Sequence, residues 1–132
     1  MASGEQIKWT SVTLDCADAE ALGSFYADLL GWEITARNGA DWVQVRNPHG
    51  GVGLNFQTEH SYEPPTWPEQ PGQQAKMMHF EILVEELEPA VAQVLRAGGT
   101  EAPHQPADRD RTRIRIMLDP AGHPFCLFVH GE

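Results

Sequence analysis

The sequence predicts an α+β domain made of two βαβββ modules, which form a curved mixed sheet cup with helices outside. Two observations predict it: the same order of strand and helix patterns occurs twice, and each strand has one aliphatic and one more polar face. A chain of 132 residues suits one domain. We therefore expect a single domain over 1–132, with module 1 at about 7–57, a linker at 58–76 and module 2 at about 77–130.

The repeat appears as two similar offsets between the halves of the chain, 68 residues for the opening strands and 72 for a later turn. An offset of 68 residues places the opening strand of the first half on that of the second, with Ser11 on His79. Later in each half a turn tetrapeptide recurs, at 47–50 and again at 119–122, between two alternating strands. Two modules of one design predict a duplicated, pseudo-twofold fold.

Each half contains one helix with recognisable ends. In 18–30, apolar residues recur at spacings of three and four, Asp18 suits an N-cap and Gly31 a C-terminal stop. In 87–97 a second apolar stripe ends at Gly98. Both helices are therefore expected to pack one face against a sheet.

Side chains alternate between the two faces of each predicted strand, which separates residues expected in the core from residues expected at a site. The aliphatic faces carry Val12, Leu14, Val43, Val45, Phe80, Ile82, Ile114 and Ile116. The opposite faces carry Ser11, Thr13, Asp15, Trp42, Gln44, Arg46, His79, Glu81, Leu83, Arg113, Arg115 and Met117. Helices should cover the aliphatic faces and leave the polar faces to line the cup. An open antiparallel sheet with one wet face fits the same pattern and is the alternative.

Charge and terminal composition narrow the class of partner. The net charge of −10 argues against nucleic acid and against anionic membranes, because both bind basic surfaces. No run of about 18 apolar residues occurs, so no membrane span is expected. The N-terminus lacks a basic segment followed by an apolar run, which predicts a cytoplasmic protein with Cys16 and Cys126 as free thiols.

The segment between the modules contains several prolines, which exclude a central strand and a helix interior. Trp67 lies among these prolines and suggests that the segment folds back onto the body of the protein. A solvated linker is the alternative.

Short motifs in a fixed order carry a family resemblance. After the opening strand they are DAEALGSFY (18–26), LLGW (29–32), YEPPTWP (62–68), HFEI (79–82), GG (98–99) and DPAGHPFCL (119–127). Together they resemble the vicinal oxygen chelate superfamily of glyoxalases, bleomycin-resistance proteins and dioxygenases, and within it short glyoxalase-like proteins. The resemblance spans about 7–129 and implies a cup around a small-molecule pocket and a homodimer. It specifies the superfamily, not an activity.

The resemblance also implies four metal-ligand positions, two per module, which fall here on Ser11, Leu54, His79 and Cys126. Only His79 is a good ligand for a transition metal, since a buried cysteine is more often a small hydrophobe. Shifting the second position by one residue substitutes Asn55, from the other face of its strand, and does not repair the site. We therefore predict no cofactor and no metal site of the usual kind.

Without a metal, the polar faces carry the candidate site. His79 and Glu81 share a face and form a predicted catalytic acid–base pair, with a structural polar pair as the alternative. Arg113 and Arg115 offer planar donors to a carboxylate or phosphate, with a charged edge strand as the alternative. The other predicted ligand-binding residues are Trp9, Ser11, Trp42, Gln44, Trp67 and Cys126.

Two functions from different classes follow. The first is a metal-independent enzyme of the lyase or isomerase type that acts on a small anionic organic molecule. The alternative is a non-catalytic binding or drug-sequestering protein of the bleomycin-resistance type. The expected partners are a small-molecule ligand and a second copy of the chain. The remaining histidines mostly fall in predicted loops, where isolated histidines are usually solvated: His49, His60, His104, His123 and His130.

Overall fold

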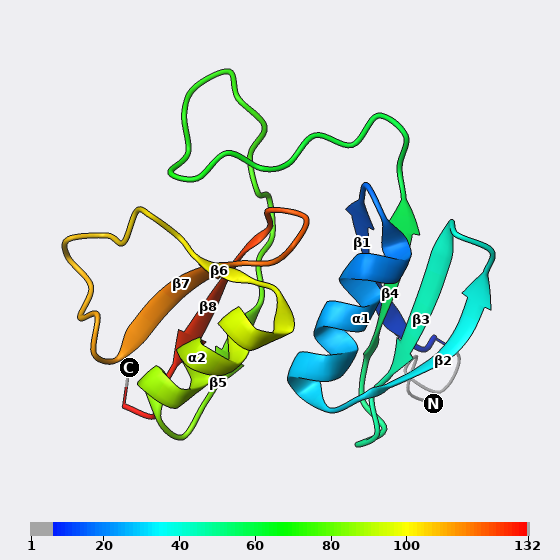
Figure 1. Ribbon diagram of the computed structural model, residues 1–132, viewed down its shortest axis with the longest axis horizontal. Helices are drawn as coiled ribbons and strands as arrows, with labels where there is room; N and C mark the ends of the chain where they lie inside the picture. Colours follow the sequence, from blue (N-terminus) through cyan, green and yellow to red (C-terminus); the bar gives the residue numbers. More distant parts are fainter. Residues whose placement is uncertain (1–6, 132) are drawn as a thin grey trace. The chain divides into compact units, whose positions relative to one another are not determined.

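The computed structural model describes residues 7–131. The chain separates into two compact units, unit 1 ending at His60 and unit 2 beginning at Ser61. Each unit contains one βαβββ module, so the predicted duplication is confirmed (Figure 1). Within the described residues, no helix has the length and apolar character needed to cross a membrane.

Unit 1 is a four-stranded mixed sheet with one helix. Its elements are β1 (Ser11–Cys16), α1 (Ala19–Leu30), β2 (Glu33–Asn38), β3 (Trp42–Arg46) and β4 (Gly53–Thr58). The strand order is β1-β4-β3-β2, in which β1 runs parallel to β4 and the other neighbours are antiparallel. The first strand of the module therefore lies beside its last strand.

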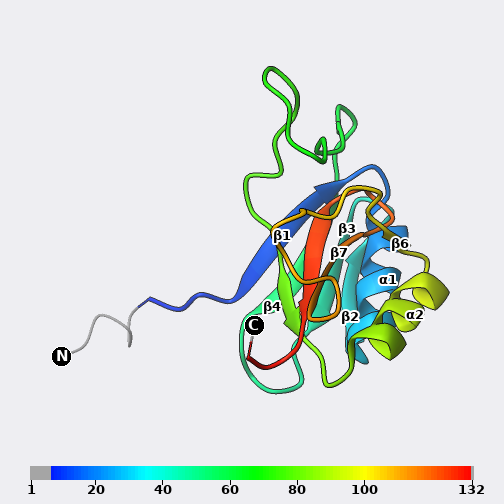
Figure 2. The ribbon, with the colours of Figure 1, turned by 90° about the vertical axis from the view of Figure 1, so that its left-hand side faces the viewer.

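Unit 2 repeats this topology. Its elements are β5 (Glu81–Leu83), α2 (Leu87–Ala97), β6 (Thr100–Glu101), β7 (Ile114–Leu118) and β8 (Pro124–Phe128). The order β5-β8-β7-β6 matches that of unit 1, and β5 is again parallel to β8. In each unit the helix covers one face of the unit's own sheet (Figure 2). The combination of both sheets into one cup, and the single-domain organisation, stay predictions.

The helix ends agree with the sequence. The Asp18 carboxylate accepts a hydrogen bond from the Ala21 amide at 3.1 Å, which satisfies one of the free N–H groups at the start of α1. Gly31 ends α1 in the left-handed region with φ 70°, and Gly98 ends α2 with φ 114°. A side chain at either glycine would strain the backbone in this conformation. Both helix ends therefore depend on the glycine itself, which can be recognised in the sequence.

The core of unit 1 is apolar. Tyr26 of α1 stacks on Phe56 of β4 with ring centroids 5.6 Å apart, and both residues are fully buried. Gly23 lets the helix approach β3, because a Cβ there would lie 2.8 Å from Val43 Cγ1. Val45 is buried on the same side of the sheet, as the alternation predicts.

The predicted face assignment of β7 is wrong. Arg115 and Met117 are buried on the side of α2, with 6% and 0% of their surface exposed, whereas Ile114 and Ile116 lie on the other face. The reason is charge compensation: the Arg115 guanidinium contacts Glu88 of α2 at 2.6 Å and Glu101 of β6 at 3.2 Å. Its aliphatic stem can then lie in the core while its charge is paired.

Candidate functional site

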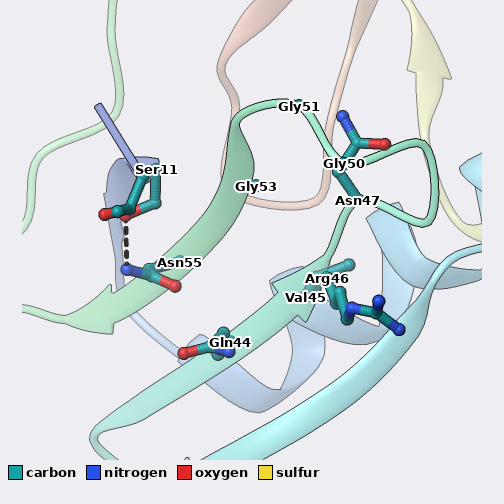
Figure 3. A pocket seen from close by; sticks show the side chains of 10 residues that line it. Ser11, Gln44, Val45, Arg46, Asn47, Gly50, Gly51, Gly53 and Asn55 are labelled. Atoms are coloured by element: carbon teal, nitrogen blue, oxygen red, sulfur yellow. Dashed lines mark hydrogen bonds between the residues drawn. The ribbon is translucent and has the colours of Figure 1, made fainter. Parts of the chain in front are cut away.

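A hollow of about 350 Å³ lies in unit 1 (Figure 3). We call it the unit 1 hollow. Its lining comes from the segment before β1, from β1, β3 and β4, and from the β3–β4 turn. The lining residues are Thr10, Ser11, Gln44, Val45, Arg46, Asn47, Gly50, Gly51, Gly53 and Asn55.

Strand alternation places the polar lining on the face turned away from α1. In β4, Leu54 and Phe56 are buried, and Asn55 between them points to the other face. The β3–β4 register sets Gln44 directly beside Asn55. The Asn55 amide Nδ2 donates to Ser11 Oγ at 3.0 Å, which joins β1 to β4 through their side chains. Ser11 and Gln44 were predicted as ligand-binding residues, and the same hollow contains both.

Hydrogen bonds of the Asn47 side chain fix the conformation of the turn between β3 and β4. The Asn47 side chain accepts from the His49 amide at 2.9 Å and donates to the Val52 carbonyl at 3.2 Å. Gly53 follows, and a Cβ at this position would lie 3.1 Å from the Val45 carbonyl oxygen. The backbones of β3 and β4 can therefore approach closely where the hollow begins.

Among the residues that the structure describes, Arg46 is the charged residue of the lining, and no acidic side chain lines the hollow. Among the described residues, Arg46 forms no ion pair, although Glu33 is its register partner on β2. Its side chain extends away from the Ser11–Asn55 pair, on the side of β2 (Figure 3). There it also lines a second hollow of about 270 Å³, together with Gly31, Trp32, Glu33 and Pro48. Arg46 thus gives this face of unit 1 a positive charge that forms no ion pair within residues 7–131.

In unit 2, His79 and Glu81 lie in contact. His79 Nε2 is 3.5 Å from Glu81 Oε2, and the side chains are 34% and 65% exposed. The predicted opening strand at 77–82 is shorter than expected, since β5 begins at Glu81. Met77 has φ 62°, a left-handed conformation that ends an extended strand, so His79 precedes β5 instead of lying within it.

Cys126 of β8 lies beside Glu81 in the sheet register. Burial, followed by the negative charge of Glu81, raises the pKa of the Cys126 thiol, while Arg109 and Lys76 act in the opposite direction. The thiol lines a small cavity of about 40 Å³ with Ile114, Ile116, Gln105, Pro106, Arg109 and Arg111. Cys126 is therefore kept as the neutral thiol, next to the predicted acid–base pair.

The other predicted ligand-binding residues lie apart from these two places. Trp9 is 73% exposed before β1 and donates its indole N–H to the Ser11 carbonyl at 2.9 Å. Trp42 begins β3 on the same face as Gln44 and is half-buried, but it does not line the unit 1 hollow. Arg113 donates to the His130 carbonyl. Arg115 is buried beneath α2, so the expectation that it lies on the polar face is wrong.

The segment that connects the modules folds onto unit 2, as Trp67 suggested. The Trp67 indole donates to the His104 carbonyl at 3.0 Å, and Lys76 Nζ lies 4.9 Å from the centre of the Trp67 ring. The Tyr62 hydroxyl donates to the Ala121 carbonyl at 2.7 Å and lies 3.4 Å from His123 Nε2. These contacts contradict a fully solvated linker.

His123 is also held inside unit 2, unlike the solvated loop residue that was expected. Its Nδ1 lies 2.8 Å from Oδ2 of Asp119, whose side chain is completely buried. The same carboxylate accepts from the backbone amides of Ala121 and His123. Asp119 and His123 therefore build the β7–β8 turn.

The donor sets do not fit a transition metal in either unit. In unit 1 the implied position Leu54 is buried in the core, and its neighbour Asn55 is hydrogen-bonded to Ser11, so the pair is an amide and a hydroxyl. In unit 2, His79 is a good ligand, but the raised pKa of Cys126 disfavours the thiolate that binds metals. Within residues 7–131, no three His, Cys, Asp or Glu side chains lie close enough together to hold a metal ion.

Sequence reasoning missed several residues of the hollow. Arg46 and Asn47 were not singled out, and Asn55 was considered only as a replacement for Leu54. The signal for Asn55 was the same alternation that placed Ser11 and Gln44, since Leu54 and Phe56 on either side are apolar. The turn glycines carry no comparable signal, because their role depends on how closely β3 and β4 approach.

Fold and site together define a protein of duplicated βαβββ modules with a polar hollow in unit 1. The family described as Glyoxalase-like domain matches residues 11–128, and the chain belongs to this family. The resemblance inferred from the motifs is thereby confirmed. No functionally curated protein matches the chain.

Solved structures with the same fold are distant in sequence. A glyoxalase/bleomycin resistance protein/dioxygenase family enzyme from Burkholderia phytofirmans PsJN is 17% identical with a TM-score of 0.66, covering 93% of this chain and 98% of its own. A glyoxalase family protein from Enterococcus faecalis is 22% identical with a TM-score of 0.64, covering 92% and 96%. A glyoxalase-related enzyme from Fulvimarina pelagi is 20% identical with a TM-score of 0.64, covering 93% and 88%. At these identities the likeness establishes the fold alone.

Proposed function

We propose that this protein binds a small anionic organic molecule in the unit 1 hollow. The observation that carries the proposal is the charge of the lining. Among the described residues, Arg46 lacks an ion-pair partner and no acidic side chain lines the hollow. In a chain with a net charge of −10, such a place is a local exception. Arginine binds carboxylates through two parallel hydrogen bonds, and the surrounding amides and hydroxyls can orient the remainder of the ligand.

Binding without chemistry is the function that this hollow supports best. Within residues 7–131, no histidine, cysteine, aspartate or glutamate belongs to its lining. A side chain that exchanges protons near neutral pH is therefore missing from the lining, and general acid–base catalysis needs one within hydrogen-bond reach. The proposal favours the sequestering type of protein over the lyase or isomerase.

Isothermal titration with lactate and malate tests the proposal. We expect saturable binding that weakens at least about tenfold in Arg46→Gln, because a charge-assisted hydrogen bond is lost. Arg37→Gln is the matched control, since Arg37 is an exposed arginine of the same sheet that does not line the hollow. Absence of binding by the native protein, or equal weakening in both variants, would contradict the proposal. Native mass spectrometry of the same samples also tests the predicted homodimer.

Catalysis at His79 is the second candidate, because His79 Nε2 and Glu81 Oε2 lie 3.5 Å apart. In this function Glu81 orients the imidazole, which removes a proton from a carbon next to a carbonyl and later returns one. Exchange of the methyl protons of pyruvate in D₂O, followed by NMR, tests it. We expect accelerated exchange that is lost in His79→Ala. A rate equal to that of the buffer would leave binding as the function.

A further inference from the structure

We infer that the unit 1 hollow selects acids that carry a hydroxyl group, and that Asn55 and Ser11 recognise this hydroxyl. The inference rests on the proposed binding function and narrows its ligand class from anionic molecules in general to hydroxy acids. Its basis is the balance of hydrogen-bond donors and acceptors in the lining.

The side-chain oxygen of Asn55 is a hydrogen-bond acceptor to which no described residue donates. Its Nδ2 donates to Ser11 Oγ at 3.0 Å, but its Oδ1 is buried and has no hydrogen-bond partner within the part of the chain that the structure describes. Leaving a buried amide oxygen unpaired costs about 1–3 kcal/mol. Natural proteins rarely keep such an atom unless something outside the chain satisfies it.

Ser11 and Gln44 show what kind of group is missing. Ser11 Oγ accepts from Asn55, and no acceptor for its own hydrogen occurs among residues 7–131. Gln44 Nε2 donates to Thr35 Oγ1 at 3.1 Å, which leaves Gln44 Oε1 as a second acceptor without a partner in the same residues. The side chains of Ser11, Gln44 and Asn55 therefore offer one hydroxyl donor and two acceptors.

A ligand hydroxyl matches this pattern, because it donates one hydrogen bond and accepts others. In the proposed complex it donates to Asn55 Oδ1, which turns toward the hollow about the broad last torsion of asparagine, and it accepts from the Ser11 hydroxyl. A carbonyl or ether oxygen at the same place only accepts and leaves Asn55 Oδ1 unpaired. A metal cation is disfavoured, because the lining has no carboxylate to neutralise it and contains Arg46.

Three acids that differ at one oxygen test the inference: lactate as both enantiomers, pyruvate and 2-methoxypropanoate. Lactate has the hydroxyl, pyruvate has a carbonyl in its place, and the methoxy acid keeps the oxygen but loses its hydrogen. Dissociation constants are measured by chemical-shift changes in NMR titrations. We expect lactate to bind about tenfold more tightly than the other two, since a site built around a ligand hydroxyl rejects analogues that lack it.

The variant Asn55→Leu removes the acceptor at nearly constant side-chain size. Its dissociation constants for lactate, pyruvate and the methoxy acid should therefore become about equal. Gln57→Leu is the matched control, because Gln57 lies two residues further along β4, is exposed and pairs with Glu59 outside the hollow. The control should keep the preference. If circular dichroism shows that Asn55→Leu is unfolded, Asn55→Ala takes its place with the same expected loss.

The possible outcomes separate this inference from the proposed function. Equal affinity for all three acids, or a preference that survives Asn55→Leu, overturns the inference and leaves anion binding intact. Failure of all three acids to bind overturns both. A preference for lactate that the variants at Asn55 abolish and Gln57→Leu keeps supports the inference.

Discussion

The sheets of unit 1 and unit 2 have the same strand order but different chemistry on both faces. Under α1 the sheet is apolar, with Phe56 stacked on Tyr26, whereas under α2 the buried side includes Arg115 and its carboxylate partners. On the opposite faces, unit 1 presents neutral hydrogen-bonding groups and the Arg46 guanidinium around its hollow, and unit 2 presents His79, Glu81 and Cys126.

The difference shows that duplicating a topology does not duplicate a site. Backbone pairing and the apolar stripes of the helices are enough to repeat the βαβββ order. The side chains that remain on each sheet face can then diverge, provided that every buried polar group finds a partner. Asn55 Oδ1, the buried side-chain atom without a partner among the described residues, therefore points to function.

The largest effect is expected for the apolar core of unit 1. Phe56→Ala should lower the free energy of unfolding by about 3–5 kcal/mol, because a fully buried aromatic ring is lost and a cavity remains. Urea unfolding followed by circular dichroism measures it. A loss below about 1 kcal/mol would mean that the stacking on Tyr26 contributes little, and the contrast between the two cores would disappear.

A smaller loss is expected for the charged core of unit 2. Arg115→Met should cost about 1–3 kcal/mol in the same measurement, because Glu101 and the Arg111 carbonyl lose a donor. Glu88 is 72% exposed and can return to water, which limits the cost. An unchanged or higher stability would show that the buried cation is dispensable and that both cores depend on apolar packing.

The outer face of unit 2 can be tested through its thiol. Burial and Glu81 raise the pKa of the Cys126 thiol, so less of it is thiolate at pH 8. Iodoacetamide should therefore react more slowly with Cys126 than with the thiol of glutathione. Glu81→Gln removes the second cause, lowers the pKa and should increase the rate about two- to threefold. Cys16 is fully buried, and peptide mapping by mass spectrometry assigns the modified residue. An identical rate in Glu81→Gln would separate Cys126 from the predicted acid–base pair.

The smallest effect is expected at the exposed ion pair of unit 1. Arg37 contacts Glu20 at 2.7 Å and, through its hydrogen bond and charge, lowers the pKa of the Glu20 carboxyl. Such a lowered pKa stabilises the fold above the ordinary pKa of glutamate, and the contribution is lost as the pH falls through the lowered value. Because both side chains are solvated, Arg37→Gln should shift the urea midpoint only slightly at pH 7 and not at all at acid pH. A large shift at pH 7 would make this surface pair comparable to the Arg115 network.

The sequence by itself determined the two modules, the helix bounds and most of the strand faces. These features depend on local signals: the N-cap at Asp18, glycines that end both helices, and alternation or 3.6-residue spacing within one element. Ser11 and Gln44 could be placed on the site face for the same reason.

Only the tertiary structure decided which polar groups would be buried and which would face a ligand. Arg115 lies in the core because Glu88 and Glu101, distant in sequence, reach it there, and alternation alone cannot reveal such compensation. His79 precedes its strand because of the backbone turn at Met77. Arg46 and Asn55 became candidate site residues because, among the described residues, the Arg46 guanidinium has no ion-pair partner and Asn55 Oδ1 has no hydrogen-bond donor. Whether a charge or an amide finds a partner depends on neighbours from other strands and helices, which the folded chain brings together.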